Sequence, residues 1–115
     1  MSVTVWFNPA CSKCRAVKSL LEERGIEAHY RLYLEEAPTV AELQDLITKL
    51  DDPEAAQLLR GKEAEYVARD LDNATAEARI AAAVEVPKLI NRPIVVNGDR
   101  AIVARPADLA AKVLD

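Results

Sequence analysis

A single turn near the N-terminus separates a strand-like pattern from a helical one, and this change constrains the fold more than any other feature. Residues 2–7 alternate valine with polar residues and end in aromatic residues, which is typical of a strand. Asn8-Pro9 predicts the turn that ends this strand. From Cys11 onward, apolar residues recur at helical spacing until Gly25, a residue type that often caps helices. The pattern therefore predicts a strand, a tight turn and a helix that begins beside Cys11.

The next segments extend this order with a second strand and a block of helices. Residues 27–33 alternate enough to form a second strand, and a capping box at Thr39 predicts the start of an amphipathic helix. Pro53 predicts the start of another short helix. Residues 63–84 are rich in alanine and predict helix, with an interruption near residues 71–73.

The last part of the chain predicts a hairpin and a final helix. Residues 92–96 form a strand-like run, and Asn97-Gly98 is a strong signal for a type I′ turn. Residues 99–103 then return as the partner strand. Pro106 suits the first turn of a helix that follows this hairpin.

The complete order is strand-helix-strand, a helical insertion, then strand-strand-helix. This order predicts a thioredoxin-like α/β fold, with a mixed sheet of about four strands flanked by helices. A chain of 115 residues is large enough for one core, so we expect a single domain over residues 1–115. In this layout the first helix begins at the carboxyl end of the first strand, which places Cys11 where active sites are usually found.

The charge of the chain argues against several classes of partner. A net charge of -4 gives no bulk attraction to nucleic acid or to anionic lipid, so we expect neither as a partner. The sequence has no apolar run long enough to span a membrane and no signal-like start, so we expect a cytoplasmic protein. We also expect a monomer. Any anion site must then be built from local charges.

Both cysteines of the chain lie at the start of the first predicted helix. Cys11 would face unpaired N–H groups and the positive end of the helix dipole, and Lys13 and Arg15 would add charge nearby, so its thiolate is favoured. Cys14 lies one helical turn further on, within reach of a C-x-x-C disulfide. The alternative is a pair of small buried thiols that only pack. We expect no metal site, because His29 is the only histidine and there is no second C-x-x-C.

Five short motifs, in order and at compatible spacing, resemble the glutaredoxin-dependent arsenate reductase family over nearly the whole chain. The motifs are Asn8-Pro9-Ala10-Cys11 followed by Ser12-Lys13-Cys14-Arg15, Leu32-Tyr33-Leu34-Glu35, Leu58-Leu59-Arg60 with Tyr66 beyond it, Asn91-Arg92-Pro93-Ile94-Val95-Val96, and Arg105-Pro106. The resemblance implies a thioredoxin-like domain in which Cys11 attacks arsenate. It also implies that three arginines, Arg60, Arg92 and Arg105, hold the oxyanion.

Other residues of these motifs are expected to support the nucleophile. They are Asn8, Ser12, Lys13, Arg15 and Pro93. By the resemblance Pro93 is a cis-proline opposite the cysteine, and the alternative is an ordinary trans proline that begins an edge strand. Planar guanidinium groups bind tetrahedral oxyanions bidentately, so an arginine site is compatible with an acidic chain. Each arginine, taken alone, would also fit a solvated surface residue.

Two positions depart from the family pattern. Well-known members have a histidine before Asn-Pro, whereas this chain has Phe7, so ionisation of Cys11 must rest on the helix terminus and on nearby cations. The founding reductases have serine three residues after the nucleophile, whereas this chain has Cys14, so a Cys11–Cys14 disulfide would release arsenite. No bound cofactor is expected. The reductant would be a glutathione/glutaredoxin, thioredoxin or mycothiol system.

The sequence leaves two other functions open. A general dithiol oxidoreductase would use Cys11 and Cys14 on protein disulfides and would keep the arginines only for the fold. An Spx-type transcriptional regulator shares the fold and the C-x-x-C and binds RNA polymerase, although Leu59-Arg60 and Arg105-Pro106 resemble the reductases more closely. An oxyanion site beside Cys11 would distinguish the reductase from both, since fold alone does not determine function.

Overall fold

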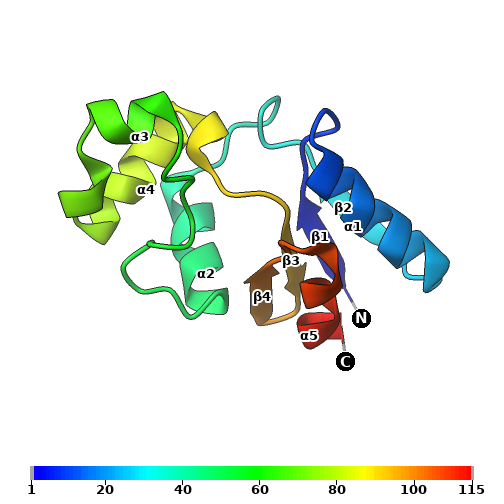
Figure 1. Cartoon of the computed structure of the whole chain (residues 1–115). Helices are drawn as coiled ribbons and strands as arrows, with labels where there is room; N and C mark the ends of the chain where they lie inside the picture. Colours follow the sequence, from blue (N-terminus) through cyan, green and yellow to red (C-terminus); the bar gives the residue numbers. More distant parts are fainter. Residues whose placement is uncertain (1, 115) are drawn as a thin grey trace. The chain divides into compact units, whose positions relative to one another are not determined.

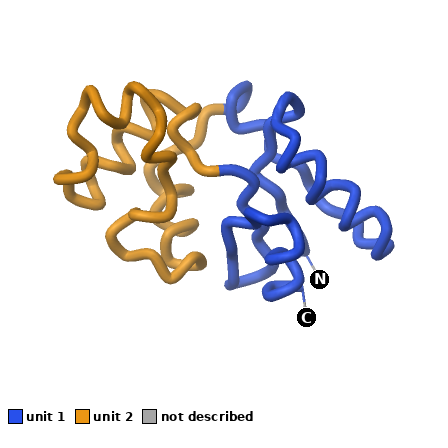
Figure 2. Tube along the Cα trace, viewed as in Figure 1, with its two compact units in different colours: residues 1–36, 92–115 blue, residues 37–91 orange. Residues whose placement is uncertain are grey.

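The computed structural model describes residues 2–114, which divide into two compact units. Unit 1 contains the described residues up to 36 and from 92 onward, and unit 2 contains residues 37–91 (Figure 2). Unit 2 is therefore an insertion between the two halves of unit 1. The single domain over residues 1–115 stays a prediction, because an insertion of this size can still fold together with its host.

Unit 1 is built on a four-stranded mixed sheet with the strand order β2-β1-β3-β4 (Figure 1). Its strands are β1 (Val3–Trp6), β2 (Ala28–Arg31), β3 (Ile94–Asn97) and β4 (Arg100–Val103). β2 runs parallel to β1, whereas β3 is antiparallel to both β1 and β4. Helix α1 (Ser12–Glu23) connects β1 to β2, and the 3-10 helix η3 (Ala107–Ala110) continues into α5 (Ala111–Leu114) after β4. The predicted thioredoxin-like order is confirmed.

One apolar layer joins the helices of unit 1 to the sheet. The buried residues of α1 are Cys14, Val17 and Leu21, which recur at helical spacing. They belong to the same core cluster as Val5 of β1 and Val95 of β3. Burying an aliphatic side chain of this kind contributes roughly 1.5–3 kcal/mol. This packing fixes the start of α1 against the carboxyl end of β1.

The hairpin turn lies one residue later than predicted. Asn97 pairs with Val3 on β1 and with Arg100 on β4, so it completes β3 instead of entering the turn. The turn residues are Gly98 and Asp99, and of these two only Gly98 has a positive φ, of 64°. A type I′ turn needs a positive φ at both positions, so the prediction of a type I′ turn at Asn97-Gly98 is wrong.

Unit 2 consists of helices and loops, as predicted. α2 (Val40–Lys49) begins at a complete capping box, in which Thr39 and Glu42 each accept the other's backbone N–H. The alanine-rich region forms α3 (Ala64–Ala68) and α4 (Ala76–Glu85), and the interruption between them contains the 3-10 helix η1 (Leu71–Asn73). A second 3-10 helix, η2 (Pro87–Leu89), follows α4 and was not predicted.

A loop held by Asp52 replaces the helix predicted to begin at Pro53. The side chain of Asp52 is buried, and its carboxylate accepts the N–H groups of residues 56–58 at 2.9, 2.8 and 3.2 Å. Ala55 has a φ of 56°, which lies in the left-handed region and interrupts a right-handed helix. The prediction is wrong because a side-chain acceptor competes with the helical backbone for these N–H groups.

The buried guanidinium of Arg79 holds this loop to the helices of unit 2. It donates to the carbonyl oxygens of Glu54, Leu71 and Asp72 at 2.8, 2.8 and 3.0 Å. Those three oxygens come from the loop and from η1, while Arg79 itself lies on α4. One side chain therefore connects three segments that would otherwise leave backbone carbonyl groups unpaired.

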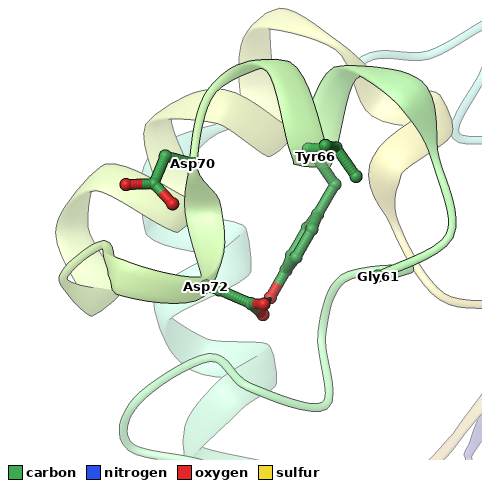
Figure 3. A pocket seen from close by; sticks show the side chains of 5 residues that line it. Gly61, Tyr66, Asp70 and Asp72 are labelled. Carbon is green, nitrogen blue, oxygen red and sulfur yellow. Dashed lines mark hydrogen bonds between the residues drawn. The ribbon is translucent and has the colours of Figure 1, made fainter.

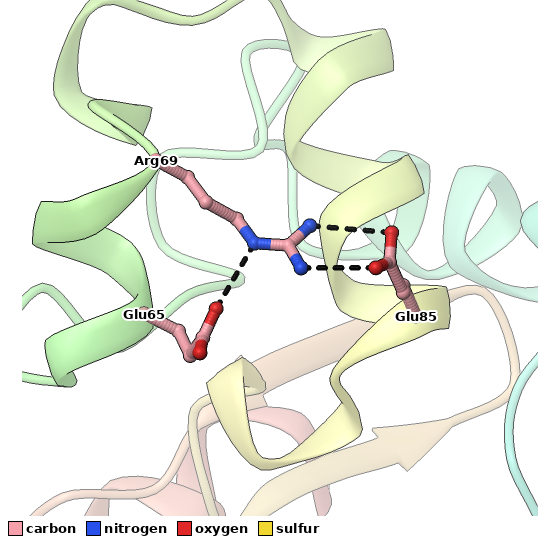
Figure 4. A network of polar contacts seen from close by, with 3 residues as sticks. All are labelled: Glu65, Arg69 and Glu85. Carbon is pink, nitrogen blue, oxygen red and sulfur yellow. Dashed lines mark hydrogen bonds and ion pairs between the residues drawn. The ribbon is translucent and has the colours of Figure 1, made fainter.

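An exposed ion-pair network links the end of α3 to the end of α4 (Figure 4). Arg69 donates through Nε to Glu65 at 3.1 Å and through both Nη atoms to Glu85 at 3.2 and 3.0 Å. The paired guanidinium lowers the pKa of the Glu85 carboxyl below its usual value. Because these groups are exposed, the ion pairs contribute little to the free energy of unfolding. Their main effect is to fix how the ends of the two helices lie relative to each other.

Asp52→Ala should lower the free energy of unfolding by about 3 kcal/mol, because three N–H groups in a buried loop lose their acceptor. Glu54→Ala, which removes an exposed carboxylate two residues away, is the matched control and should change stability by less than about 0.5 kcal/mol. Urea denaturation followed by circular dichroism measures both. Equal effects of the two substitutions would contradict the proposed role of the Asp52 carboxylate.

Candidate active site

The loop between β1 and α1 places Cys11 as the N-cap residue of α1. The backbone of Cys11 is extended, with φ −92° and ψ 122°, and its N–H donates to the carbonyl oxygen of Asn8 at 3.0 Å. The side-chain oxygen of Asn8 accepts the N–H of Ala10 at 3.0 Å. Asn8 therefore shapes the turn with both of its oxygen atoms, which is why an asparagine suits this position.

The surroundings of Cys11 lower its pKa below the ordinary thiol value of 9.0. Partial burial is the largest single influence and acts in the opposite direction, because it disfavours the charged thiolate. It is outweighed by hydrogen bonds to the sulfur from the N–H and thiol of Cys14, the N–H of Lys13 and the guanidinium of Arg92. Cys11 is thus the more acidic thiol of the pair and the better nucleophile at neutral pH.

Cys14 is fully buried in the core of unit 1. Burial raises the pKa of its thiol to about 11, and the neighbouring Cys11 sulfur acts in the same direction. The N–H of Asn8, 3.5 Å from Sγ, and the positive charge of Arg92 oppose this rise without cancelling it. The two thiols are therefore unequal, and Cys14 stays protonated at neutral pH.

Arg92 brings a guanidinium group to the cysteines. Its positive side chain lowers the pKa of Cys11, and its Nε is buried with no hydrogen-bond partner among the described residues. A buried N–H donor without an acceptor is rare and costs stability, so an acceptor on a bound molecule would complete it. The Arg92–Pro93 peptide bond is cis, as the family resemblance implied for Pro93.

Arg105 is hydrogen-bonded to the backbone of Arg92. Its Nη1 donates to the carbonyl oxygen of Arg92 at 3.2 Å, and the N–H of Ala104 donates to that of Pro93 at 2.9 Å. The Arg105–Pro106 bond is also cis. The sequence did not indicate this second cis bond, since cis is the minority form of any X–Pro bond and Arg-Pro carries no signal for it. The structure thus brings two of the three predicted arginines together.

The other residues in the first turn of α1 act mainly through the backbone. Lys13 lowers the pKa of Cys11 through its N–H, and the guanidinium of Arg15 donates to the carbonyl oxygen of Pro9 at 2.9 Å. Ser12 is exposed and opens the helix. The Arg15 side chain therefore stabilises the loop that precedes Cys11. The sequence did not indicate this role.

Phe7 stands where well-known relatives have histidine, and it belongs to the core. Its ring meets the ring of Tyr30 edge-on, with centroids 5.1 Å apart, and its N–H donates to the carbonyl oxygen of Arg31 at 2.9 Å. The position therefore contributes packing and carries no titratable group. The ionisation of Cys11 depends on the hydrogen bonds described above.

Arg60 belongs to unit 2, whereas Cys11, Arg92 and Arg105 belong to unit 1. Its Nη1 donates to Oε1 of Glu63 at 2.6 Å, and its N–H donates to the carbonyl oxygen of Leu89 at 2.7 Å. Leu59 beside it pairs with Ile90 in an isolated bridge. Arg60 thus has a fixed backbone and an acidic partner, and its predicted contact with an oxyanion stays a prediction.

A small hollow lies beside α3 and η1 in unit 2 (Figure 3). It has a volume of about 120 Å³ and is lined by Gly61, Tyr66, Val67, Asp70 and Asp72. The hydroxyl of Tyr66 points at Asp72 and donates to its carboxylate at 2.7 Å, which raises the pKa of Tyr66. With two carboxylates and no cation in its lining, this hollow does not suit an oxyanion.

The described residues contain neither a cluster of metal ligands nor a membrane-spanning helix. Among residues 2–114, no three histidine, cysteine or acidic side chains gather closely enough to hold a metal ion. None of the helices in this part of the chain is both long enough and apolar enough to cross a membrane.

The chain resembles known proteins over nearly its whole length. The model of the ArsC family matches residues 6–113. An arsenate reductase of Haemophilus influenzae is 40% identical over 116 residues, which cover 99% of this chain and 100% of that protein. An arsenate reductase of Escherichia coli is 32% identical over 114 residues, covering 98% and 81% of the two chains. The solved structure of an arsenate reductase from Vibrio cholerae matches with a TM-score of 0.94 at 40% identity, covering 99% and 98%.

Arg92→Met should raise the pKa of Cys11, because the thiolate loses a charged hydrogen-bond donor, and should slow its alkylation by iodoacetamide at pH 7. The pH dependence of the alkylation rate, with the modified cysteine located by mass spectrometry, measures this pKa. Arg24→Met is the matched control, since Arg24 is exposed at the other end of α1, roughly 20 Å along the helix axis. An unchanged profile for Arg92→Met, or the same shift for both variants, would contradict the contact.

Proposed function

The chain belongs to the ArsC family, and from this premise we propose that it reduces arsenate to arsenite with Cys11 as the nucleophile. The match over residues 6–113 confirms the family resemblance read from the sequence motifs. The observation that carries the assignment of residues is the acidic thiol of Cys11 beside the unpartnered Nε–H of Arg92. These two groups supply a nucleophile and a ligand for an oxyanion in one place.

The first proposed step is attack of the Cys11 thiolate on arsenic. A sulfur–arsenic bond forms while one arsenic–oxygen bond breaks, and the oxygen leaves as hydroxide, which then takes a proton from solvent. Arsenic remains pentavalent in the covalent thio-arsenate. Only the thiolate is a competent nucleophile, which is why the hydrogen bonds that lower the pKa of Cys11 matter for the rate.

Arg92 and Arg105 are the proposed ligands of the oxyanion in unit 1. The buried Nε–H of Arg92 needs an acceptor, and a guanidinium binds a tetrahedral anion through two parallel N–H groups. Arg105 is held beside Arg92 by one hydrogen bond and has five N–H donors in total. The family resemblance makes Arg60 the third ligand. Its ion pair with Glu63 would have to loosen before a second anion could share the guanidinium.

The second proposed step uses Cys14 as the resolving thiol. Its sulfur attacks the sulfur of Cys11, a disulfide forms, and the sulfur–arsenic bond breaks with its electron pair on arsenic. Two thiols are oxidised and arsenic is reduced from the pentavalent to the trivalent state, while the proton of Cys14 leaves on arsenite. The position of Cys14 in the first turn of α1, three residues after the N-cap Cys11, supports this role, since it places the two sulfurs on one face of the helix.

The ArsC family uses thiol reductants, and the disulfide must be reduced before the next turnover. We propose that glutaredoxin with glutathione, thioredoxin, or a mycothiol system does this. The proposed reaction needs no bound cofactor, because the thiols themselves carry both electrons. The cytoplasmic location and the monomeric state stay predictions.

A general dithiol oxidoreductase is the second candidate, and the unequal pair of Cys11 and Cys14 favours it as much as it favours the reductase. A dithiol enzyme for protein disulfides has no need of an oxyanion ligand, however. The buried Nε–H of Arg92 has no acceptor among the described residues, and this is the observation that favours arsenate.

Purified protein should oxidise NADPH in an arsenate-dependent way when coupled to the glutaredoxin/glutathione or the thioredoxin system. Cys11→Ser should reduce this rate to background, because serine is not ionised at neutral pH and cannot form the adduct. Ser19→Cys is the matched control for a serine–cysteine exchange on the exposed surface of α1 and should keep the wild-type rate. The absence of an arsenate-dependent rate with the glutaredoxin, thioredoxin and mycothiol systems alike would reject the proposed function.

Cys14→Ser should block release of arsenite by the internal route, so that turnover comes to require an external thiol on Cys11. After one turnover without added thiol, intact mass spectrometry should find the wild-type chain lighter by two hydrogens, as a disulfide. The variant should instead retain the arsenic adduct. Unchanged turnover of Cys14→Ser with the same thiol partner would exclude a resolving role.

A further inference from the structure

The two thiols of unit 1 form a preassembled pair of soft ligands. Cys11 is the N-cap of α1 and Cys14 lies in its first turn, on the same face of the helix. Both are free, and they are close enough that each influences the pKa of the other. The packing of Cys14 in the core and the N–H of Asn8 on its Sγ hold the second sulfur in place. Cys11 is partly exposed, so a small molecule can reach the pair.

We infer that the reduced pair chelates trivalent arsenic through both sulfur atoms. This rests on the proposed function for the claim that the ligand is the product of the enzyme's own reaction. Arsenite, As(OH)₃, exchanges two hydroxyl groups for the two thiols and releases two molecules of water. Arsenic stays trivalent, each thiol gives up its proton to a departing hydroxyl group, and no oxidant or reductant is needed.

Sulfur chemistry favours this ligand over the other ions that a thiol pair might take. Thiolates are soft donors, and trivalent arsenic with two sulfurs and one remaining hydroxyl group is satisfied by three ligands. A tetrahedral zinc ion would need more, and among residues 2–114 no third histidine, cysteine or acidic side chain joins the pair. The Arg92 side chain is near enough to Cys11 to lower its pKa, and its buried, unpartnered Nε–H is a donor for the remaining hydroxyl group.

Chelation would make the oxidation state of the pair control the binding of product. Formation of the Cys11–Cys14 disulfide releases arsenite and at the same moment removes both ligands. Reduction of the disulfide restores them, so arsenite would compete with arsenate only for the reduced enzyme. The arsenite-binding site and the arsenate site thus share Cys11. Arsenite therefore inhibits the reduced enzyme, and it binds through two sulfurs because Cys14 supplies the second one.

Phenylarsine oxide tests the chelate without arsenate, because it condenses with two thiols and releases one water. The reduced full-length chain is incubated with one equivalent of it and an excess of glutathione, desalted, and weighed intact. Wild type should retain one phenylarsenic group and lose it to dithiothreitol. Cys14→Ser should bind about 100-fold more weakly, since the second sulfur acts intramolecularly in the wild type.

The matched control moves the second thiol without changing the composition. Cys14→Ser combined with Ser19→Cys keeps two thiols on α1 but separates them by roughly 12 Å along the helix axis, too far for one arsenic atom. Retention by this variant equal to wild type, or no retention by wild type in glutathione, would overturn the chelate. Alkylation of Cys11 gives a second readout: arsenite should protect it much better in wild type than in Cys14→Ser, and equal protection in the two would also overturn the chelate.

Failure of this inference and failure of the proposed function are separate results. The phenylarsine oxide measurement uses neither arsenate nor a coupled reductant. A chain that retains the probe but shows no arsenate-dependent NADPH oxidation supports the chelate and rejects the reductase. A chain that reduces arsenate but does not retain the probe rejects the chelate alone.

Discussion

The site depends on donor groups that surround one sulfur atom at the start of α1 and lower its pKa. The N–H groups of Lys13 and Cys14, the thiol of Cys14 and the guanidinium of Arg92 all favour the thiolate of Cys11 over its thiol. Free N–H groups occur at the beginning of every helix, but here the helix is docked by Val17 and Leu21 against the sheet. The apolar layer of unit 1 therefore positions the donors that give Cys11 its acidity.

The same surroundings separate the two thiols into different roles. Burial raises the pKa of Cys14 to about 11, whereas the donors around Cys11 lower its pKa in spite of partial burial. A pair with one acidic and one protonated thiol has a defined order of reaction, with Cys11 attacking first and Cys14 following. Phe7 adds no titratable group to this arrangement, so the division rests on the helix terminus, the buried neighbour and Arg92.

The sequence predicts the features that depend on local patterns and misses those that depend on distant partners. The helix that begins at Thr39 and the turn before Cys11 follow from residues within a few positions of each other. The predicted turn at Asn97-Gly98 is wrong because Asn97 pairs with a residue of β1. The predicted helix at Pro53 is wrong because the buried Asp52 carboxylate accepts N–H groups that a helix would use. These contacts arise only in the folded chain.

For the site, sequence motifs named Cys11, Cys14, Arg92 and Arg105 but could not give their geometry. Only the folded structure shows that the Nε–H of Arg92 is buried without a partner and that the Arg92 side chain lowers the pKa of Cys11. In the sequence alone, an arginine that acts at a site cannot be told from one on the surface. The most direct test of the proposed mechanism is a crystal structure of Cys14→Ser soaked with arsenate, because the wild-type chain would go on to the disulfide and release arsenite. We predict arsenic bonded to the Cys11 sulfur, with its oxygen atoms on the guanidinium groups of Arg92 and Arg105. An oxyanion bound elsewhere, with Cys11 unmodified, would contradict it.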